Sequence, residues 1–105
     1  MQKYPVRTSH RVRLTLPQLL ETCRTIFGTA EVRDGDVVAT FGALARLATR
    51  PDGKELRVDV TMDPKVPLDI AAETVRRYNH FLETATGYTA KERARRLRKA
   101  GAASA

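Results

Sequence analysis

The chain has 105 residues, of which 42% are hydrophobic and 30% charged, and its formal net charge is +7. This length predicts one domain, residues 1–100, followed by a frayed tail, residues 101–105. The sequence has no membrane-spanning apolar run and no secretory signal, so we expect a cytoplasmic protein without membrane association. Its single cysteine, Cys23, excludes an internal disulfide, and we expect neither a metal nor a cofactor.

The first residues combine apolar and basic side chains. This composition predicts an N-terminal strand within residues 2–14. Pro5 cannot donate a ladder hydrogen bond, so the strand is expected at the edge of a sheet. The apolar side chains of this segment are Tyr4, Val6, Val12 and Leu14.

A helix is predicted next, over residues 16–27. Thr15 and Gln18 have the spacing of a capping box, Pro17 suits the first turn, and Gly28 favours the left-handed conformation that ends a helix. At a period of 3.6 residues the apolar side chains fall on one arc, which predicts one buried face: Leu16, Leu19, Leu20, Cys23, Ile26 and Phe27.

Four short segments predict two β-hairpins. Residues 30–33 and 36–41 flank Asp34-Gly35, a two-residue turn that places Val32 opposite Val37. Residues 44–50 and 55–62 flank a second turn around Gly53, and a bulge there would decide which face Arg46 takes, so this register stays open. Strict alternation in the last segment predicts four inward side chains: Leu56, Val58, Val60 and Met62.

The longest predicted helix begins after Pro67 and ends at Gly87. Apolar and polar residues separate cleanly at a helical period, which indicates a helix with one buried face. The apolar arc contains Ile70, Ala71, Val75, Tyr78, Phe81, Leu82 and Ala85.

A short basic helix is predicted beyond Gly87, opened by a capping box between Thr89 and Glu92. Its only acid is Glu92, so the segment carries +5 of the net charge. Like charges three and four residues apart repel one another, and an anionic partner would relieve that repulsion. Ala90, Ala94 and Leu97 form a narrow apolar stripe along it.

These elements predict an α+β fold of two layers. We expect an antiparallel sheet of three to four strands, the two amphipathic helices on one face, and the short basic helix at the C-terminus.

Single residues give weak indications of chemistry. His80 lies on the polar arc of the long helix, where a solvated face with a Glu73–Arg77 pair accounts for it. Cys23 lies within an apolar arc, which predicts a buried, inert thiol. The carboxylates of Asp34, Asp36 and Asp52 belong to turns. We therefore predict no catalytic residue and no enzymatic activity.

The basic C-terminal segment is the one functional signal that remains. Its side chains are expected to follow a phosphate backbone, and Tyr88 beside them is expected to stack on a base. The N-terminal cations, with Lys3 and His10, would join them if the chain ends meet in space. The predicted nucleic-acid-binding residues are Lys91, Arg93, Arg95, Arg96, Arg98, Lys99, Arg7, Arg11, Arg13 and Tyr88. The alternative is that the basic segment only keeps the protein in solution, and that its many arginines follow from GC-rich coding.

Two sequence blocks, Tyr4-Pro-Val-Arg7 and the stretch from Arg77 to Arg93, resemble a family of small conserved archaeal proteins of unknown function. The resemblance covers nearly the whole chain and is most specific from Phe81 to Arg93. It implies a single α+β domain in an archaeal cytoplasm. The family has no assigned activity, so the resemblance implies no site residues.

The sequence thus predicts a small basic module that binds nucleic acid, RNA or a ribonucleoprotein ahead of DNA, because no duplex-reading motif is present. The alternative is a protein-interaction or homodimeric adaptor protein, whose basic helix docks an acidic protein and whose apolar stripe is exposed.

Overall fold

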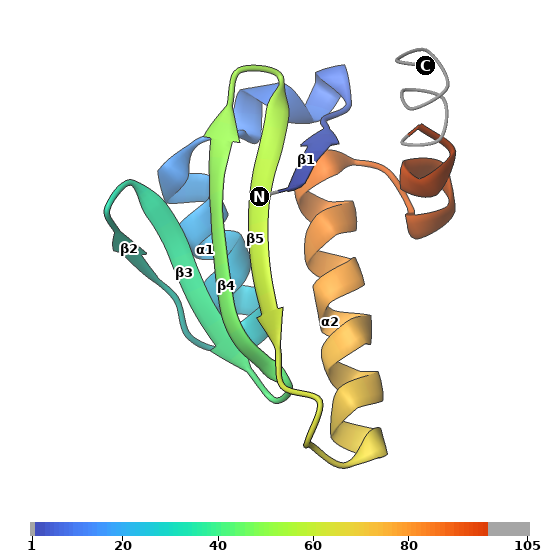
Figure 1. The fold of residues 1–105 in the computed structure, drawn as a ribbon. Coiled ribbons are helices and arrows are strands. Elements are labelled where there is room, and N and C mark those ends of the chain that lie inside the picture. The colour runs from blue at the N-terminus through green and yellow to red at the C-terminus, as the bar shows by residue number, and fades with distance from the viewer. Residues whose placement is uncertain (1, 97–105) are drawn as a thin grey trace.

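The computed structural model describes residues 2–96, except for the side chain of Arg13. The predicted tail, residues 101–105, lies outside this part. Residues 90–96 are helical and are called the C-terminal helix below. The other elements, in chain order, are β1 (Gln2–Pro5), the 3-10 helix η1 (Thr8–Arg13), α1 (Leu16–Phe27), β2 (Glu31–Arg33), β3 (Asp36–Phe41), β4 (Leu44–Asp52), β5 (Glu55–Met62) and α2 (Leu68–Thr86) (Figure 1).

The strands form one antiparallel sheet in the order β1-β5-β4-β3-β2. This confirms the α+β class and the position of the N-terminal strand at an edge. The predicted three to four strands fall short of the five observed. The terminal strands β1 and β2 have only four and three residues, too few for a clear periodicity.

Both hairpins form where the turn residues predict them. Val32 pairs with Val37 across Asp34-Gly35, as expected. In the second hairpin Asp52 pairs with Glu55, and the register shift lies between Leu44 and Arg46, not at Gly53. The predicted inward position of Met62 is wrong, since 38% of this residue is exposed at the end of β5.

The segment after β1 is not strand, as residues 8–13 form η1. Short-range backbone bonds hold it: the His10 N–H donates to the Arg7 carbonyl at 2.8 Å, and the Leu14 N–H donates to the Arg11 carbonyl at 3.1 Å. Val12 is 82% exposed, so its apolar side chain was a misleading strand signal.

Helix α1 is as predicted. The Thr15 hydroxyl accepts from the Gln18 N–H, and Gly28 ends the helix with φ +86°. Helix α1 packs against β2, β3, β4 and α2, and the rings of Phe27 and Phe81 lie 5.9 Å apart in the core between the helices. Figure 1 shows α1 behind the sheet and α2 along the side of β5.

The buried face of α2 differs from the predicted arc. Phe81 and Leu82 are buried as expected, but Ile70 and Val75 are 41% and 50% exposed. Thr74 is fully buried instead, because its hydroxyl accepts from the Ala43 N–H in the β3–β4 turn and donates to the Ile70 carbonyl. Thr86 is also buried and bonded. Two threonines that the predicted apolar arc did not include therefore belong to the buried face of α2.

Candidate nucleic-acid interface

The C-terminal helix begins with the predicted capping box. The Glu92 N–H donates to the Thr89 hydroxyl at 3.2 Å, and the Glu92 carboxylate accepts from the Thr89 N–H at 3.0 Å. These bonds hold the pKa of Glu92 below its usual range, and the bond from the Thr89 backbone N–H contributes most to this lowering. The hydrogen bonds of the cap therefore favour the charged carboxylate, which is the form that accepts from the Thr89 N–H.

The N-terminal segment meets the start of the C-terminal helix, as the joint basic surface requires. The Arg7 N–H donates to the Thr86 carbonyl at 2.8 Å, and its guanidinium donates to the Gly87 carbonyl at 3.0 Å. The same guanidinium pairs with the Glu92 carboxylate at 3.2 Å. The N-terminal segment is thereby tied to the start of the C-terminal helix.

Tyr88 lies at the centre of this junction. The guanidinium carbons of Arg7 and Arg96 lie 4.6 and 4.2 Å from its ring centroid. Guanidinium groups over an aromatic ring are mutually favourable, and here they cover it. Only 7% of Tyr88 is exposed, so the prediction that its ring stacks on a base is corrected: the ring supports the two arginines.

Arg93 is not part of the surface. It is 4% exposed, and its guanidinium donates to the Tyr88 carbonyl at 2.6 Å and to the Asn79 side-chain oxygen at 3.1 Å. Burial lowers the pKa of this guanidinium, with Tyr4, Glu83 and Tyr78 acting in the opposite direction. The prediction that Arg93 contacts phosphate is therefore wrong, because the side chain fastens the C-terminal helix to α2.

The predicted binding residues left at the surface are Lys91, Arg95 and Arg96 on the C-terminal helix, Arg7, which is bonded to the start of that helix, and Arg11 on η1. We call these five residues the basic face. Arg11 is exposed, and its guanidinium also donates to the Val6 carbonyl at 3.1 Å. Arg98, Lys99 and the side chain of Arg13 lie outside the described part of the chain.

Cations elsewhere are largely paired. On the sheet face away from the helices, Arg46 lies 3.6 Å from Asp59 and Arg50 lies 3.4 Å from Asp36. Lys3 and Arg57 share Asp52, Arg33 pairs with Glu31, and Glu73 accepts from Arg76 and Arg77. Within residues 2–96 no acid pairs with Lys91, Arg95 or Arg96. Arg24, Lys54 and Lys65 also have no acidic partner there, but they lie apart from one another along the chain, whereas Lys91, Arg95 and Arg96 share one short helix.

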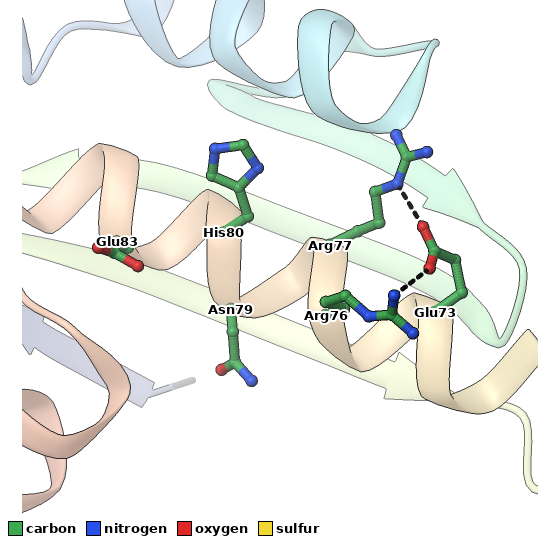
Figure 2. Close-up of a pocket in the computed structure, with 6 residues that line it drawn as sticks. All are labelled: Glu73, Arg76, Arg77, Asn79, His80 and Glu83. Atoms are coloured by element: carbon green, nitrogen blue, oxygen red, sulfur yellow. Dashed lines mark hydrogen bonds and ion pairs between the residues drawn. The ribbon is translucent and has the colours of Figure 1, made fainter.

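The polar side of α2 carries His80. A surface hollow of about 460 Å³ is lined by Glu73, Arg76, Arg77, Asn79, His80 and Glu83, all from this one helix. Figure 2 shows Asn79 and His80 pointing to different sides, while Arg76 and Arg77 turn to Glu73. The predicted Glu73–Arg77 pair is confirmed at 3.0 Å, and the side chains do not converge on one point.

Cys23 is fully buried, as predicted, and burial raises the pKa of its thiol to about 12. The thiolate that nucleophilic chemistry needs is thus strongly disfavoured. Asp34 and Asp36 lie at the first turn, and Asp52 lies at the end of β4. In residues 2–96 no three His, Cys, Asp or Glu side chains gather as a metal site would require.

Sequence reasoning missed the residues that build the junction. No role was predicted for Asn79 or Thr86, yet Asn79 accepts from Arg93 and the Thr86 hydroxyl accepts from the Tyr88 N–H at 3.2 Å. The only local signal is Gly87, whose φ of +80° and close approach to His10 leave no room for a side chain. No helix within residues 2–96 has the length and apolar character needed to cross a membrane.

Comparison with known proteins gives a family and a fold. No curated protein matches the chain. The solution structure of a hypothetical protein from Thermoplasma acidophilum is similar, with a TM-score of 0.66 and 25% sequence identity over 92% of this chain and 97% of that chain. The profile of a domain of unknown function, DUF5611, matches residues 1–99. The chain therefore belongs to the uncharacterised family DUF5611, which is the resemblance that its sequence indicated.

Proposed function

We propose that this protein binds nucleic acid, structured RNA or a ribonucleoprotein, through the basic face. One observation carries the proposal: Lys91, Arg95 and Arg96 are exposed and have no acidic partner in residues 2–96, whereas most other cations are paired. Cations of this kind bind phosphates by releasing condensed counterions. Arginine suits this role because its planar guanidinium forks onto phosphate oxygens.

The ends of the chain add to this surface. Arg7 and Arg96 both lie against the Tyr88 ring, and Arg7 is also held by the Gly87 carbonyl. Long side chains that are already positioned lose less conformational entropy when they bind. The basic face therefore combines exposed cations with two arginines that lie against the Tyr88 ring.

The proposal is tested by fluorescence anisotropy of the full chain with a labelled RNA hairpin and a DNA duplex of matched length. A truncation after Tyr88 is unsuitable, because it would remove Arg93 and Glu92, which hold the junction together. Binding to either probe near physiological salt supports the proposal. Polyglutamate serves as the acidic competitor. Displacement of the labelled nucleic acid by a modest excess of polyglutamate would favour the alternative, an acidic protein partner. Ala90 and Ala94 are exposed, as that alternative requires.

Glu92 occupies Arg7 in the free protein and therefore competes with phosphate for it. We expect Glu92→Gln to raise nucleic-acid affinity about five- to tenfold at 0.1 M salt, the effect of about one additional phosphate contact. Glutamine keeps the capping box with Thr89, so the helix start is preserved. Anisotropy titration measures the change.

The matched control is Glu83→Gln, which removes one acidic charge near the junction but leaves Arg7 paired. We expect Glu83→Gln to raise the nucleic-acid affinity about twofold or less, because it changes only the long-range electrostatic field of the protein. If both variants gain equally, release of Arg7 is not the cause. The gain from Glu92→Gln should also disappear when Arg7 is replaced by glutamine.

A further inference from the structure

The first turns of α2 place large apolar side chains in solvent. Among the described residues, six large apolar side chains are exposed to solvent. Four of the six lie between the end of β5 and the third turn of α2: Met62, Leu68, Ile70 and Val75. Leu68 is 88% exposed. Apolar groups concentrated on one part of a surface mark interaction sites more often than singly scattered ones do.

One side of α2 carries a regular stripe. Leu68, Ala72, Val75 and Asn79 recur at spacings of four, three and four residues, the spacing at which paired helices present their contact side chains. Asn79 accepts from Arg93, so the C-terminal helix covers the stripe at this point. Figure 1 shows that helix beside the last turns of α2 only. Leu68, Ala72 and Val75 are exposed.

The neighbouring strand edge is also incomplete. β1 pairs with residues 55–58 of β5, and no strand of the described chain lies beside residues 59–62 on that edge. Natural proteins usually cover or charge such edges. The loop 63–67 joins this edge to the stripe, so the two features belong to one end of the molecule.

Charges along the stripe complement one another under a two-fold axis. Asp69 and Arg76, seven residues apart, follow the same flank of the stripe. If two α2 helices lie antiparallel with the axis between Ala72 and Glu73, Asp69 and Arg76 are equally far from the axis. Each Asp69 then faces Arg76 of the other copy, and Leu68 lies near Val75. Ala72 at the axis permits close approach of the helices.

We propose that α2 pairs with α2 of a second copy of this chain, antiparallel, through Leu68, Ala72 and Val75. Arg76 is 74% exposed in its pair with Glu73 at 3.4 Å, so its side chain is free to reach Asp69 of that copy. The pairing places the two basic faces at opposite ends, about 45 Å apart at 1.5 Å per residue. The proposal stands independently of nucleic-acid binding.

Sedimentation velocity of the full chain over a range of concentrations tests the pairing. We expect wild type to dimerise below about 1 mM, and Val75→Lys to weaken the dimer at least tenfold, since it places a cation at the contact. The control is Val32→Lys, because Val32 is equally exposed (48% against 50%) but lies on β2. A monomeric wild type at 1 mM, or equal effects of both variants, would overturn the proposal.

A charge exchange tests the register without touching an apolar residue. Asp69→Lys and Arg76→Glu should each weaken the dimer, and the double variant should recover most of the loss, because the opposite pair is restored with its sign reversed. Thermal unfolding of each variant checks that the monomer stays folded. Absence of recovery in the double variant would contradict the antiparallel arrangement.

Discussion

Replacing Arg93 by alanine is expected to lower the free energy of unfolding by about 2 kcal/mol. The guanidinium donates to the Tyr88 carbonyl and to Asn79 in a site where Arg93 is 4% exposed. Without it the Tyr88 carbonyl loses a charged donor inside the junction, and the C-terminal helix loses its anchor on α2. Urea unfolding followed by circular dichroism measures the effect.

Arg95→Ala is the matched control, since Arg95 lies two residues away on the same helix but is exposed. We expect it to change the stability by less than about 0.5 kcal/mol. Hydrogen exchange of the Arg93 N–H, which donates to the Thr89 carbonyl at 2.9 Å, shows whether the C-terminal helix has loosened locally. Equal stabilities and equal exchange in the two variants would contradict the structural role of Arg93.

The second large effect concerns binding. A triple variant, Lys91→Gln, Arg95→Gln and Arg96→Gln, is expected to lose about a hundredfold or more in nucleic-acid affinity at 0.1 M salt, the contribution of about three phosphate contacts. Arg96 also covers the Tyr88 ring at 4.2 Å, so the folded fraction of the variant is checked by thermal unfolding. Anisotropy titration with the RNA hairpin gives the affinity.

A charge-matched variant separates position from net charge. Replacing Arg33, Arg46 and Lys65 by glutamine also removes three charges from the net +7, but from β2, β4 and the loop before α2. We expect a loss of about tenfold or less, because general field effects are weaker than direct contacts. Equal losses in both triple variants would show that overall charge, not the basic face, governs binding.

The elements were predictable where the chain carries local chemistry. Asp34-Gly35 specifies a tight turn with a fixed pairing, and the Thr15 and Thr89 caps are completed by residues three positions later. Such signals need only neighbouring residues. The segment around Val12 shows the limit, because apolar residues among basic ones do not distinguish a strand from the 3-10 turn observed.

Burial of polar residues was not predictable in this way. Thr74 is buried because the Ala43 N–H, thirty-one positions away, needs an acceptor. Arg93 is buried because Asn79 and the end of α2 offer acceptors. A buried polar group is tolerated when it is hydrogen-bonded, and the partners become evident only once the chain is folded. Periodicity alone therefore places these residues on the surface.

The candidate site shows the same division. Charge composition identified the C-terminal segment, and the structure joins Arg7 to it through Glu92 and Gly87. Composition could not separate Arg93 from Arg95, because both are arginines of one basic run. Their roles differ through contacts made by Asn79 and Tyr88.

The most direct test of the account is the salt dependence of binding by the full chain and by the Lys91, Arg95 and Arg96 triple variant. For the DNA duplex we expect the slope of log Kobs against log salt concentration to be shallower by about 2.7 in the triple variant, and for the RNA hairpin we expect the slope to become shallower as well. The charge-matched variant should keep a slope near that of the full chain. No measurable binding near physiological salt, or slopes that do not differ between the full chain and the triple variant, would contradict the nucleic-acid function.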